Sequence, residues 1–159
     1  MHEGAFGCAI AAENIEPFTQ YANQALANFD FSQKYLIDLE YDADKITPAD
    51  ILNLANFDNL WGQGIEEPFV LVKGVKVLKD NVQLLKETTL KITVEIDGQN
   101  VTLIKFGSNQ TEFDNLCSEY GNTTIDIIGR FQKNIWNGNV TPQVLIEDYE
   151  IAKKIAYYF

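Results

Sequence analysis

Two short turns in the second half of the chain constrain its fold more than any other feature of the sequence. Asp97-Gly98 and Asn137-Gly138-Asn139 are each flanked by segments in which apolar and polar residues alternate. A glycine after Asp or Asn favours the tight reverse turn that joins two antiparallel strands. The alternation is itself typical of strands with one buried face. The sequence therefore predicts two β-hairpins and a β-rich fold from about Phe69 onward.

Five strands and one helix are predicted in this second half. The strands are expected at about residues 69–78, 88–96, 100–106, 124–133 and 142–151. A helix is expected between the third and fourth strands, at about residues 110–120, and Gly121 would end it. Its apolar face would be formed by Phe113, Leu116, Cys117 and Tyr120. This element order is that of the OB-type barrel, which binds oligonucleotides or oligosaccharides.

The predicted fold class is therefore α+β and mainly β, with a five-stranded OB-type barrel over residues 69–159 and a small α/β part before it. Such barrels bind ligands on the face of their second and third strands and with the loops after the first and fourth strands. Sugars and proteins are also ligands of these barrels, so the fold alone does not give the function.

The first 68 residues are expected to form helices and short strands. A short apolar stretch at residues 5–10 suits a buried strand, and apolar residues at helical spacing predict a helix over residues 12–29. Alternation predicts a strand at residues 35–42. Thr47-Pro48-Ala49-Asp50 is typical of a helix start, so a helix is expected to about residue 57, followed by a turn-rich link. We expect residues 1–46 to form a separate part and residues 47–68 to connect it to the barrel.

Charge is distributed unevenly along the chain. The formal net charge of −11 argues against a nucleic-acid ligand, because proteins that bind nucleic acid usually carry a basic patch. However, residues 1–68 hold twelve acidic and two basic residues, whereas residues 69–159 hold eleven acidic and ten basic ones. From Phe69 to Lys105 there are six lysines and four acidic residues. The local field steers a polyanion, so the predicted barrel remains compatible with DNA.

Several protein classes are disfavoured by what the sequence lacks. No apolar run approaches the roughly 18 residues of a membrane span, and we expect no signal peptide. Cys8 and Cys117 are the only cysteines, so we expect reduced thiols in a cytoplasmic protein. Acid pairs such as Asp42 and Asp44 are interpreted as solvated surface groups rather than metal ligands. No Walker loop, Gly-x-Ser-x-Gly motif or Asp-His-His run is present, so we expect no catalysis by these residues alone.

Lysines on the predicted strands are candidates for binding phosphate groups. Lys73 and Lys76 lie on the first strand. Lys91 and Lys105 lie on the next two strands, on the expected ligand face or at its rim. Such lysines can contact successive phosphates, each contact releasing a counterion. The alternative, that they are ordinary solvated lysines opposite the core, stays open.

The last predicted hairpin carries a second group of candidates. Arg130 and Lys133 precede its turn, and Trp136 and Asn137 lie at its tip. A tryptophan is costly to expose without a use, and the base of a single strand can stack on such a ring while cations hold the backbone. In the alternative, Trp136 folds back and caps the end of the barrel.

His2 is the only histidine and a further candidate for contact with phosphate. It lies in His2-Glu3-Gly4-Ala5-Phe6-Gly7. Taken alone, we favour an exposed terminal residue, because a catalytic base needs an orienting partner that the sequence does not show.

Four stretches, in the same order, together resemble the C-terminal region of bacterial RecJ, the single-strand-specific DNA exonuclease. Residues 2–7 resemble the end of that family's Gly-Gly-His-x-x-Ala-x-Gly motif. Residues 60–69 resemble its Pro-Phe-Gly-x-Gly-Asn-Pro-Glu-Pro junction, and Thr89-Leu90-Lys91-Ile92 resembles its His-Leu-Lys-Leu strand. The family's last hairpin is resembled by Gly129-Arg130, Asn134-x-Trp136-Asn137-Gly138, Pro142-Gln143 and Ile146-Glu147-Asp148.

The resemblance implies that residues 1–46 are the end of a DHHA1 domain, that residues 47–68 are a linker, and that the barrel grips single-stranded DNA. It also implies a parent 5′–3′ exonuclease of DNA repair and recombination, with Mn²⁺ or Mg²⁺ in a catalytic domain outside these 159 residues. No cofactor is then expected in the chain itself. The alternative is a protein-interaction module, in which the acidic first part and the barrel dock a DNA-repair partner.

Overall fold

The computed structural model describes residues 7–30, 33–117 and 122–152 and divides the chain into two compact units, Met1–Lys34 and Tyr35–Phe159. The first unit holds a 3₁₀ turn, η1 (Ala12–Asn14), and the amphipathic helix α1 (Ile15–Leu26), which confirms the helix predicted there. The strand predicted at residues 5–10 is wrong for its described part, since residues 7–10 are exposed and form no strand. The described part of this unit offers no strand to pair with it. Ala5 and Phe6 lie outside the described residues.

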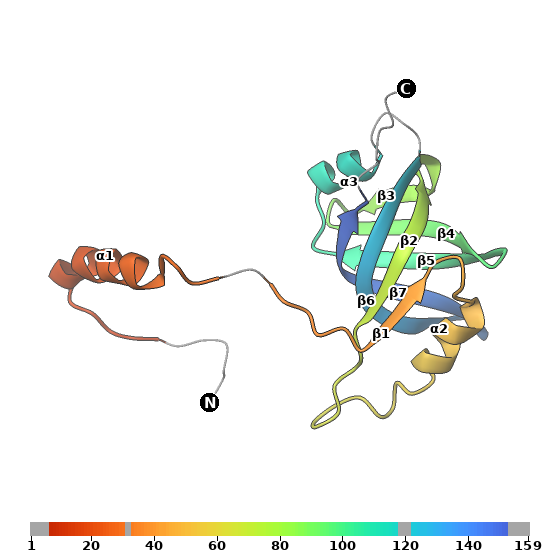
Figure 1. Cartoon of the computed structure of the whole chain (residues 1–159), viewed down its shortest axis with the longest axis horizontal. Coiled ribbons are helices and arrows are strands. Elements are labelled where there is room, and N and C mark those ends of the chain that lie inside the picture. The colour runs from red at the N-terminus through yellow and green to blue at the C-terminus, as the bar shows by residue number, and fades with distance from the viewer. Residues whose placement is uncertain (1–6, 31–32, 118–121, 153–159) are drawn as a thin grey trace. The chain divides into compact units, whose positions relative to one another are not determined.

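The second unit is built on a seven-stranded sheet in the order β1-β2-β6-β7-β5-β4-β3 (Figure 1). The strands are β1 (Leu39–Asp42), β2 (Val70–Leu78), β3 (Val82–Leu85), β4 (Thr89–Ile96), β5 (Gln99–Phe106), β6 (Asn122–Trp136) and β7 (Asn139–Ile151). All five predicted barrel strands are therefore present. The predicted helix is α3 (Gln110–Leu116), and its expected last turn lies outside the described residues.

The first barrel strand is divided in two by a short turn. β2 continues through the 3₁₀ turn η2 (Lys79–Asn81) into β3. β2 pairs antiparallel with β6, β3 pairs antiparallel with β4, and β2 also contacts β4. This bent connection closes the sheet into the OB-type barrel, in which β5 runs parallel to β7. The observed sheet thus has two strands beyond the five predicted for the barrel: β1, which confirms the strand predicted at residues 35–42, and β3, which was not predicted.

Both predicted hairpin turns are confirmed. Asp97 and Gly98 have φ values of 48° and 70°, and Asn137 and Gly138 have φ values of 48° and 80°. Two successive positive φ values define the type I′ turn, whose twist matches that of two antiparallel strands. The β6–β7 hairpin is longer than predicted, because its strands reach Trp136 and Asn139.

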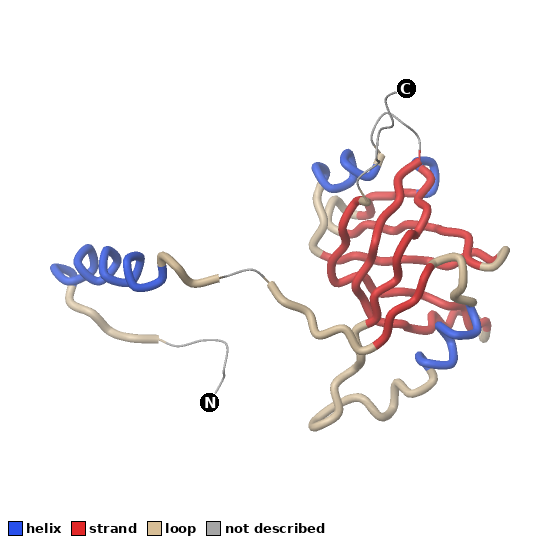
Figure 2. The backbone as a smooth tube through the Cα atoms, in the orientation of Figure 1, coloured by secondary structure: helices blue, strands red, loops and turns tan. Residues whose placement is uncertain are grey.

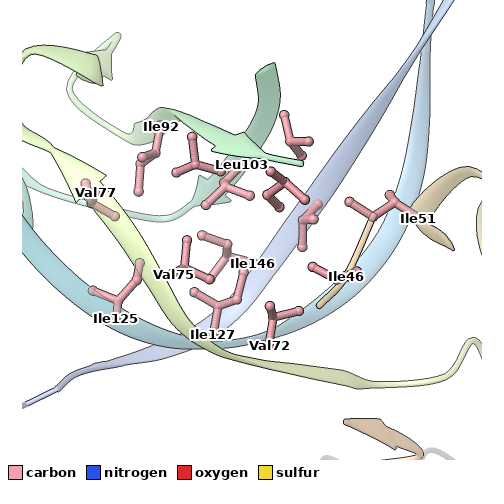
Figure 3. Close-up of a cluster of buried hydrophobic side chains, with 14 of the residues drawn as sticks. Ile46, Ile51, Val72, Val75, Val77, Ile92, Leu103, Ile125, Ile127 and Ile146 are labelled. Carbon is pink, nitrogen blue, oxygen red and sulfur yellow. The ribbon is translucent and has the colours of Figure 1, made fainter. Parts of the chain in front are cut away.

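The core is aliphatic and lies inside the barrel (Figure 3). Among the strands, residues that are at most 1% exposed come from β2, β4, β5, β6 and β7; they include Val72, Val77, Ile92, Leu103, Ile125, Ile127 and Val144. Full burial of one such side chain stabilises the fold by about 1.5–3 kcal/mol. Gly129 allows β6 and β7 to approach closely, since a Cβ there would lie 2.3 Å from the carbonyl oxygen of Leu145.

The helix α2 (Pro48–Ala55) covers one end of the barrel, where it packs on β6 and β7. Figure 2 shows α2 and α3 at opposite ends of the strand framework. α2 begins at the predicted cap: the Thr47 backbone N–H donates to Asp50 Oδ2 at 2.9 Å, and the Asp50 backbone N–H donates to Thr47 Oγ1 at 3.2 Å. Ile46 and Ile51 belong to the barrel core (Figure 3).

β1 and α2 therefore fold with the barrel. β1 pairs parallel with β2, with Leu39 beside Val70. The compact unit begins at Tyr35 rather than at Phe69, because the strand and the helix that precede Phe69 complete the sheet and the core. The assignment of residues 1–46 to the end of a DHHA1-like domain, with 47–68 as a linker, stays a prediction.

Candidate nucleic-acid interface

Alternate residues of four neighbouring strands form what we call the outer face of the barrel. In β4, Leu90, Ile92 and Val94 are buried, so the residues between them point away from the core. The same alternation holds in β5, where Val101 and Leu103 are buried. The outer face consists of Gln83, Leu85, Thr89, Lys91, Thr93, Thr102, Ile104, Phe106, Gln143 and Leu145. β4 and β5 are the second and third barrel strands, which carry the ligand face in this fold.

A row of residues crosses five strands and places Lys91 on this face. Lys91 of β4 lies beside Gln83 of β3 and Ile104 of β5. Ile104 lies beside Leu145 of β7, which in turn lies beside Arg130 of β6. Because neighbouring strands are about 4.8 Å apart, Lys91 and Arg130 are separated by about 14 Å along the sheet.

A second row, next to the first, carries hydroxyl and amide groups. It runs from Thr93 through Thr102 and Gln143 to Gln132. Gln143 Nε2 donates a hydrogen bond to Gln132 Oε1 at 3.4 Å. All four residues are half-buried, so their polar atoms remain partly open to solvent or to a ligand.

Phe106 is an exposed aromatic residue at the end of the outer face. Its side chain is 66% exposed. Register places Phe106 beside Thr89, two residues from Lys91 on the same strand, and diagonal neighbours on a sheet are within reach of long side chains. An aromatic ring beside a lysine can hold a base and a phosphate together. Phe106 was not among the candidates from sequence, although the alternation of β5 places it on the side opposite Leu103.

The turn between β3 and β4 has an unusual backbone. Lys86 and Glu87 have φ values of 49° and 61° without being glycine. The left-handed region costs an ordinary residue about 1–2 kcal/mol. Strain of this kind tends to be found at functional sites, and this turn follows the first barrel strand, where the fold places one of its ligand-binding loops.

Lys105 does not lie on the outer face, contrary to its predicted place beside Lys91. It follows Leu103 on the inward side of β5 and is opposite the buried Leu90. Its side chain is only 14% exposed, and its Nζ lies 3.0 Å from Glu112 Oε1 of α3. The ammonium group also lies 6.0 Å from the ring centre of Tyr149. Burial, and then the charges of Glu112 and Asp148, raise the pKa of Tyr149 to about 12. Lys105 therefore joins β5 to α3.

The lysines divide into paired and unpaired groups. Lys73 is paired, since its Nζ lies 2.6 Å from Glu40 Oε1 of β1, and this hydrogen bond is the main reason that the pKa of Lys73 is raised. Within the described residues, four lysines make no salt bridge: Lys76, Lys79, Lys86 and Lys91. They follow one another along β2, η2, the β3–β4 turn and β4. Among the described residues, the lysines available to a polyanion thus lie on consecutive elements of the barrel.

Arg130 is held by the chain that leads into β2. Its Nε lies 3.6 Å from Glu67 Oε2, its Nη1 lies 3.2 Å from Glu147 Oε2, and its guanidinium stacks 4.3 Å from the ring centre of Phe69. Burial raises the pKa of Glu67, and the charge of Arg130 opposes that rise. Arg130 therefore ties residues 67–69 to β6 and β7, and its charge is already compensated.

The other candidates of the last hairpin have different surroundings. Lys133 Nζ lies 3.0 Å from Asp58 Oδ2, just after α2. Trp136 is 72% exposed, so the alternative in which it folds back onto the barrel is wrong. Asn137 occupies the first positive-φ position of the turn, a position that suits Asn. His2 lies outside the described residues.

A pocket of about 320 Å³ lies between α2, the following link and β6. It is lined by Ala55, Asp58, Trp61, Glu67, Phe131, Gln132 and Lys133. Trp61 also packs on Phe57, with ring centres 6.5 Å apart. The sequence did not indicate this pocket, because its walls come from residues distant in the chain.

The described part of the chain holds neither a cluster of metal-ligating side chains nor a membrane-spanning helix. Within residues 7–30, 33–117 and 122–152, no three or more His, Cys, Asp or Glu side chains are grouped to hold a metal ion. Over the same ranges, no helix is both long and apolar enough to cross a membrane.

The strand order and the closure of the sheet define an OB-type barrel. The family model of the RecJ OB domain matches residues 37–148, which is more than half of the chain. The chain therefore belongs to the RecJ OB domain family, and the predicted fold class and family resemblance are confirmed. The matched region begins in the chain segment just before β1, in agreement with the extent of the second unit.

Curated relatives are similar to most of the chain, and solved structures share its fold. YorK of Bacillus subtilis (strain 168), named as an SPbeta prophage-derived single-strand DNA-specific exonuclease, is 25% identical over 153 residues, covering 96% of this chain and 26% of YorK. The Bacillus phage SPbeta protein of that name matches equally. RecJ of Thermus thermophilus, solved with Mn²⁺, gives a TM-score of 0.62 at 17% identity, over 91% of this chain and 20% of RecJ. Its Mg²⁺ complex gives a TM-score of 0.59. The chain thus spans about a quarter of the length of these curated relatives.

Proposed function

We propose that the outer face of this barrel binds single-stranded DNA. The observation that carries the proposal is the exposed Phe106 next to Lys91, a lysine that makes no salt bridge among the described residues. The ring can stack on an unpaired base while the ammonium group contacts a phosphate. The bases of a duplex are already stacked and paired, so this arrangement favours a single strand. The name of the relative YorK, a single-strand DNA-specific exonuclease, supports this ligand.

The proposed interface extends to both ends of the face. Lys76, Lys79 and Lys86 supply further cations for the phosphates, and Trp136 and Asn137 offer an exposed ring and an amide at the hairpin tip. We expect Lys73, Arg130 and Lys133 to contribute less than predicted from sequence, because carboxylates already hold them. His2 stays a prediction.

In this proposal the chain is the DNA-holding region of a longer RecJ-like exonuclease that acts in DNA repair and recombination in the cytoplasm. The barrel would hold the strand while a metal-dependent domain, outside this chain, hydrolyses its phosphodiester bonds from the 5′ end. The Mn²⁺ and Mg²⁺ complexes of the Thermus protein support a metal in such a domain. Residues 1–46 would include the end of the DHHA1 domain, ahead of the barrel unit that begins at Tyr35. We expect the chain alone not to cleave DNA.

Fluorescence anisotropy with a labelled oligo-dT tests the proposal at low ionic strength. Phe106→Ala should weaken binding by about 5-fold to 150-fold, since stacking one base contributes about 1–3 kcal/mol. Lys91→Ala should weaken binding and lower the slope of log K against log salt by about 0.7. Phe106→Trp, which keeps a ring, is the matched control and should bind. Absence of salt-sensitive binding, or equal affinity for duplex, would contradict the proposal.

A second candidate function is docking of a DNA-repair protein. The observation that favours it is α1, whose apolar side chains are exposed: Phe18 is 47% and Leu26 is 46% exposed. A pull-down with a purified repair protein would separate the two functions. Capture that survives both Lys91→Ala and Phe106→Ala would favour docking over DNA binding.

A further inference from the structure

The pocket beside α2 has no part in the function proposed above, although it joins the same surface. Gln132 lines the pocket and also ends the polar row of Thr93, Thr102 and Gln143. A strand that crosses the outer face along this row would therefore bring a nucleotide to the pocket entrance. We propose that the pocket takes a guanine base of the bound DNA strand, with the Glu67 carboxylate as the acceptor that selects it. This inference rests on the proposed DNA binding.

Glu67 has hydrogen-bonding capacity that nothing in the described chain uses. Its side chain is 29% exposed, and its carboxylate accepts no hydrogen bond from the described residues. The Arg130 Nε at 3.6 Å balances its charge but is too distant to count as a hydrogen bond. Burial already raises the pKa of this carboxyl group. A half-buried carboxylate in this condition gains from a ligand that donates to it.

Charge favours a neutral ligand over a cation or an anion. Lys133 lines the pocket and pairs with Asp58, and Arg130, which is not a lining residue, pairs with the lining residue Glu67. An incoming arginine or lysine side chain would meet these two cations, whereas a phosphate group would meet the two carboxylates. A neutral base meets neither penalty. Its ring can pack on Trp61, as bases pack on aromatic side chains in single-strand sites.

Guanine fits this acceptor better than the other three bases. Its Watson–Crick edge has two donors side by side, the ring N1–H and the exocyclic N2–H₂, and a carboxylate can accept both. Adenine and cytosine offer one exocyclic amino group and thymine offers one ring N–H beside acceptors that would face the carboxylate. A well-made bidentate contact discriminates between bases by about five-fold or more. The pocket volume of about 320 Å³ has room for one base.

Tryptophan fluorescence tests the pocket directly. The chain has two tryptophans, so in the Trp136→Phe protein Trp61 is the probe. We expect dGMP to quench it saturably, with a dissociation constant at least about five-fold below those of dAMP, dCMP and dTMP. Glu67→Gln should abolish this preference. Glu66→Gln, at an exposed neighbour that does not line the pocket, should keep it. A circular-dichroism melt of each variant confirms that it is folded.

The outcomes separate this inference from the proposed function. Equal quenching by the four nucleotides, no saturable quenching, or tighter binding of a short arginine peptide would overturn the guanine pocket. In anisotropy, oligo-dT with one internal guanine should bind more tightly than oligo-dT itself, and Glu67→Gln should remove the difference. If oligo-dT binds and Phe106→Ala weakens it, but guanine adds nothing, the pocket inference fails while DNA binding stands. If dGMP binds through Glu67 but no oligonucleotide binds, the proposed DNA-binding function fails.

Discussion

At the scale of single residues, side-chain direction and pairing separate the binding candidates from the structural ones. Lys91 points outward and makes no salt bridge among the described residues, whereas Lys105 points inward to Glu112. The alternation of β5 was visible in the sequence and would have placed Lys105 with Leu103. The pairing of Lys133 with Asp58 could not have been predicted, because it joins residues far apart in the chain and depends on how α2 packs.

Lys105 and Lys91 should therefore respond differently to substitution. Lys105→Ala should lower the free energy of unfolding by roughly 1–3 kcal/mol, because it leaves the half-buried Glu112 without its partner. It should change the affinity for oligo-dT by no more than about two-fold, which corresponds to a change in binding free energy smaller than RT. Urea denaturation and anisotropy measure the two quantities. If Lys105→Ala weakened binding while Lys91→Ala did not, the interface would lie on the side of β5 that carries Lys105 rather than on the outer face.

The strained β3–β4 turn gives a second prediction at this scale. Glu87→Gly should raise the free energy of unfolding by about 0.5–1 kcal/mol, because glycine adopts its φ of 61° without strain and this gain exceeds the added freedom of the unfolded chain. Glu87→Ala is the control, since alanine keeps the strain, and should give no such gain. Urea denaturation measures both. A glycine variant less stable than the wild type would show that this turn is unstrained.

At the scale of elements, the sequence predicted the type and order of the barrel elements better than their extent. Periodicity and glycine turns located both hairpins and α3, since these signals are local. β3 was missed because it is only four residues long and follows Lys79-Asp80-Asn81, which is typical of a turn. β1 was predicted as a strand, but its partner could not be, because pairing with β2 depends on closure of the sheet.

The cap of α2 predicts how stability depends on pH. Hydrogen bonds from Thr47 lower the pKa of Asp50 in the folded chain. As the pH is lowered, Asp50 is therefore protonated at a higher pH in the unfolded chain than in the folded chain. The stabilisation is thus complete above the unfolded pKa of about 3.9 and is lost as pH falls through the lower folded pKa. Asp50→Ala should cost about 1 kcal/mol at pH 7 and progressively less below about pH 4.

Urea denaturation from pH 7 to pH 3 measures this difference between wild type and Asp50→Ala. Thr47→Ala is the matched control, since it removes the other half of the same cap and should show the same trend. A difference that stays constant, or that grows as pH falls, would show that the Asp50 carboxylate does not stabilise α2.

At the scale of the whole molecule, the chain consists of two units that differ in burial. Residues 1–68, which include the first unit and the start of the barrel unit, hold twelve acidic and two basic residues and so account for most of the net charge of −11. Over the part of the chain that the structure describes, the lysines without a salt bridge lie on β2, η2, β4 and the turn before β4, so net charge says little about this face. Sequence alone could not have identified these lysines, because it does not show which other lysines are paired with carboxylates.

The barrel unit should fold without the first unit. α1 has no buried residue, and the core consists of residues from Ile46 onward. A chain that starts at Tyr35 should therefore unfold at the same temperature as the full chain within about 2 °C, a shift of less than 1 kcal/mol. Differential scanning calorimetry measures this. A much lower midpoint would mean that the first unit stabilises the barrel.

The central claim is that single-stranded DNA lies on the outer face of β4 and β5. The most direct test is a titration of the ¹⁵N-labelled chain with oligo-dT, followed by amide chemical shifts in two-dimensional NMR. We predict that the largest changes fall on the outer face around Lys91 and Phe106 and on the β3–β4 turn, with small changes near Lys105. Changes confined to α1, or no changes at low salt, would contradict the account.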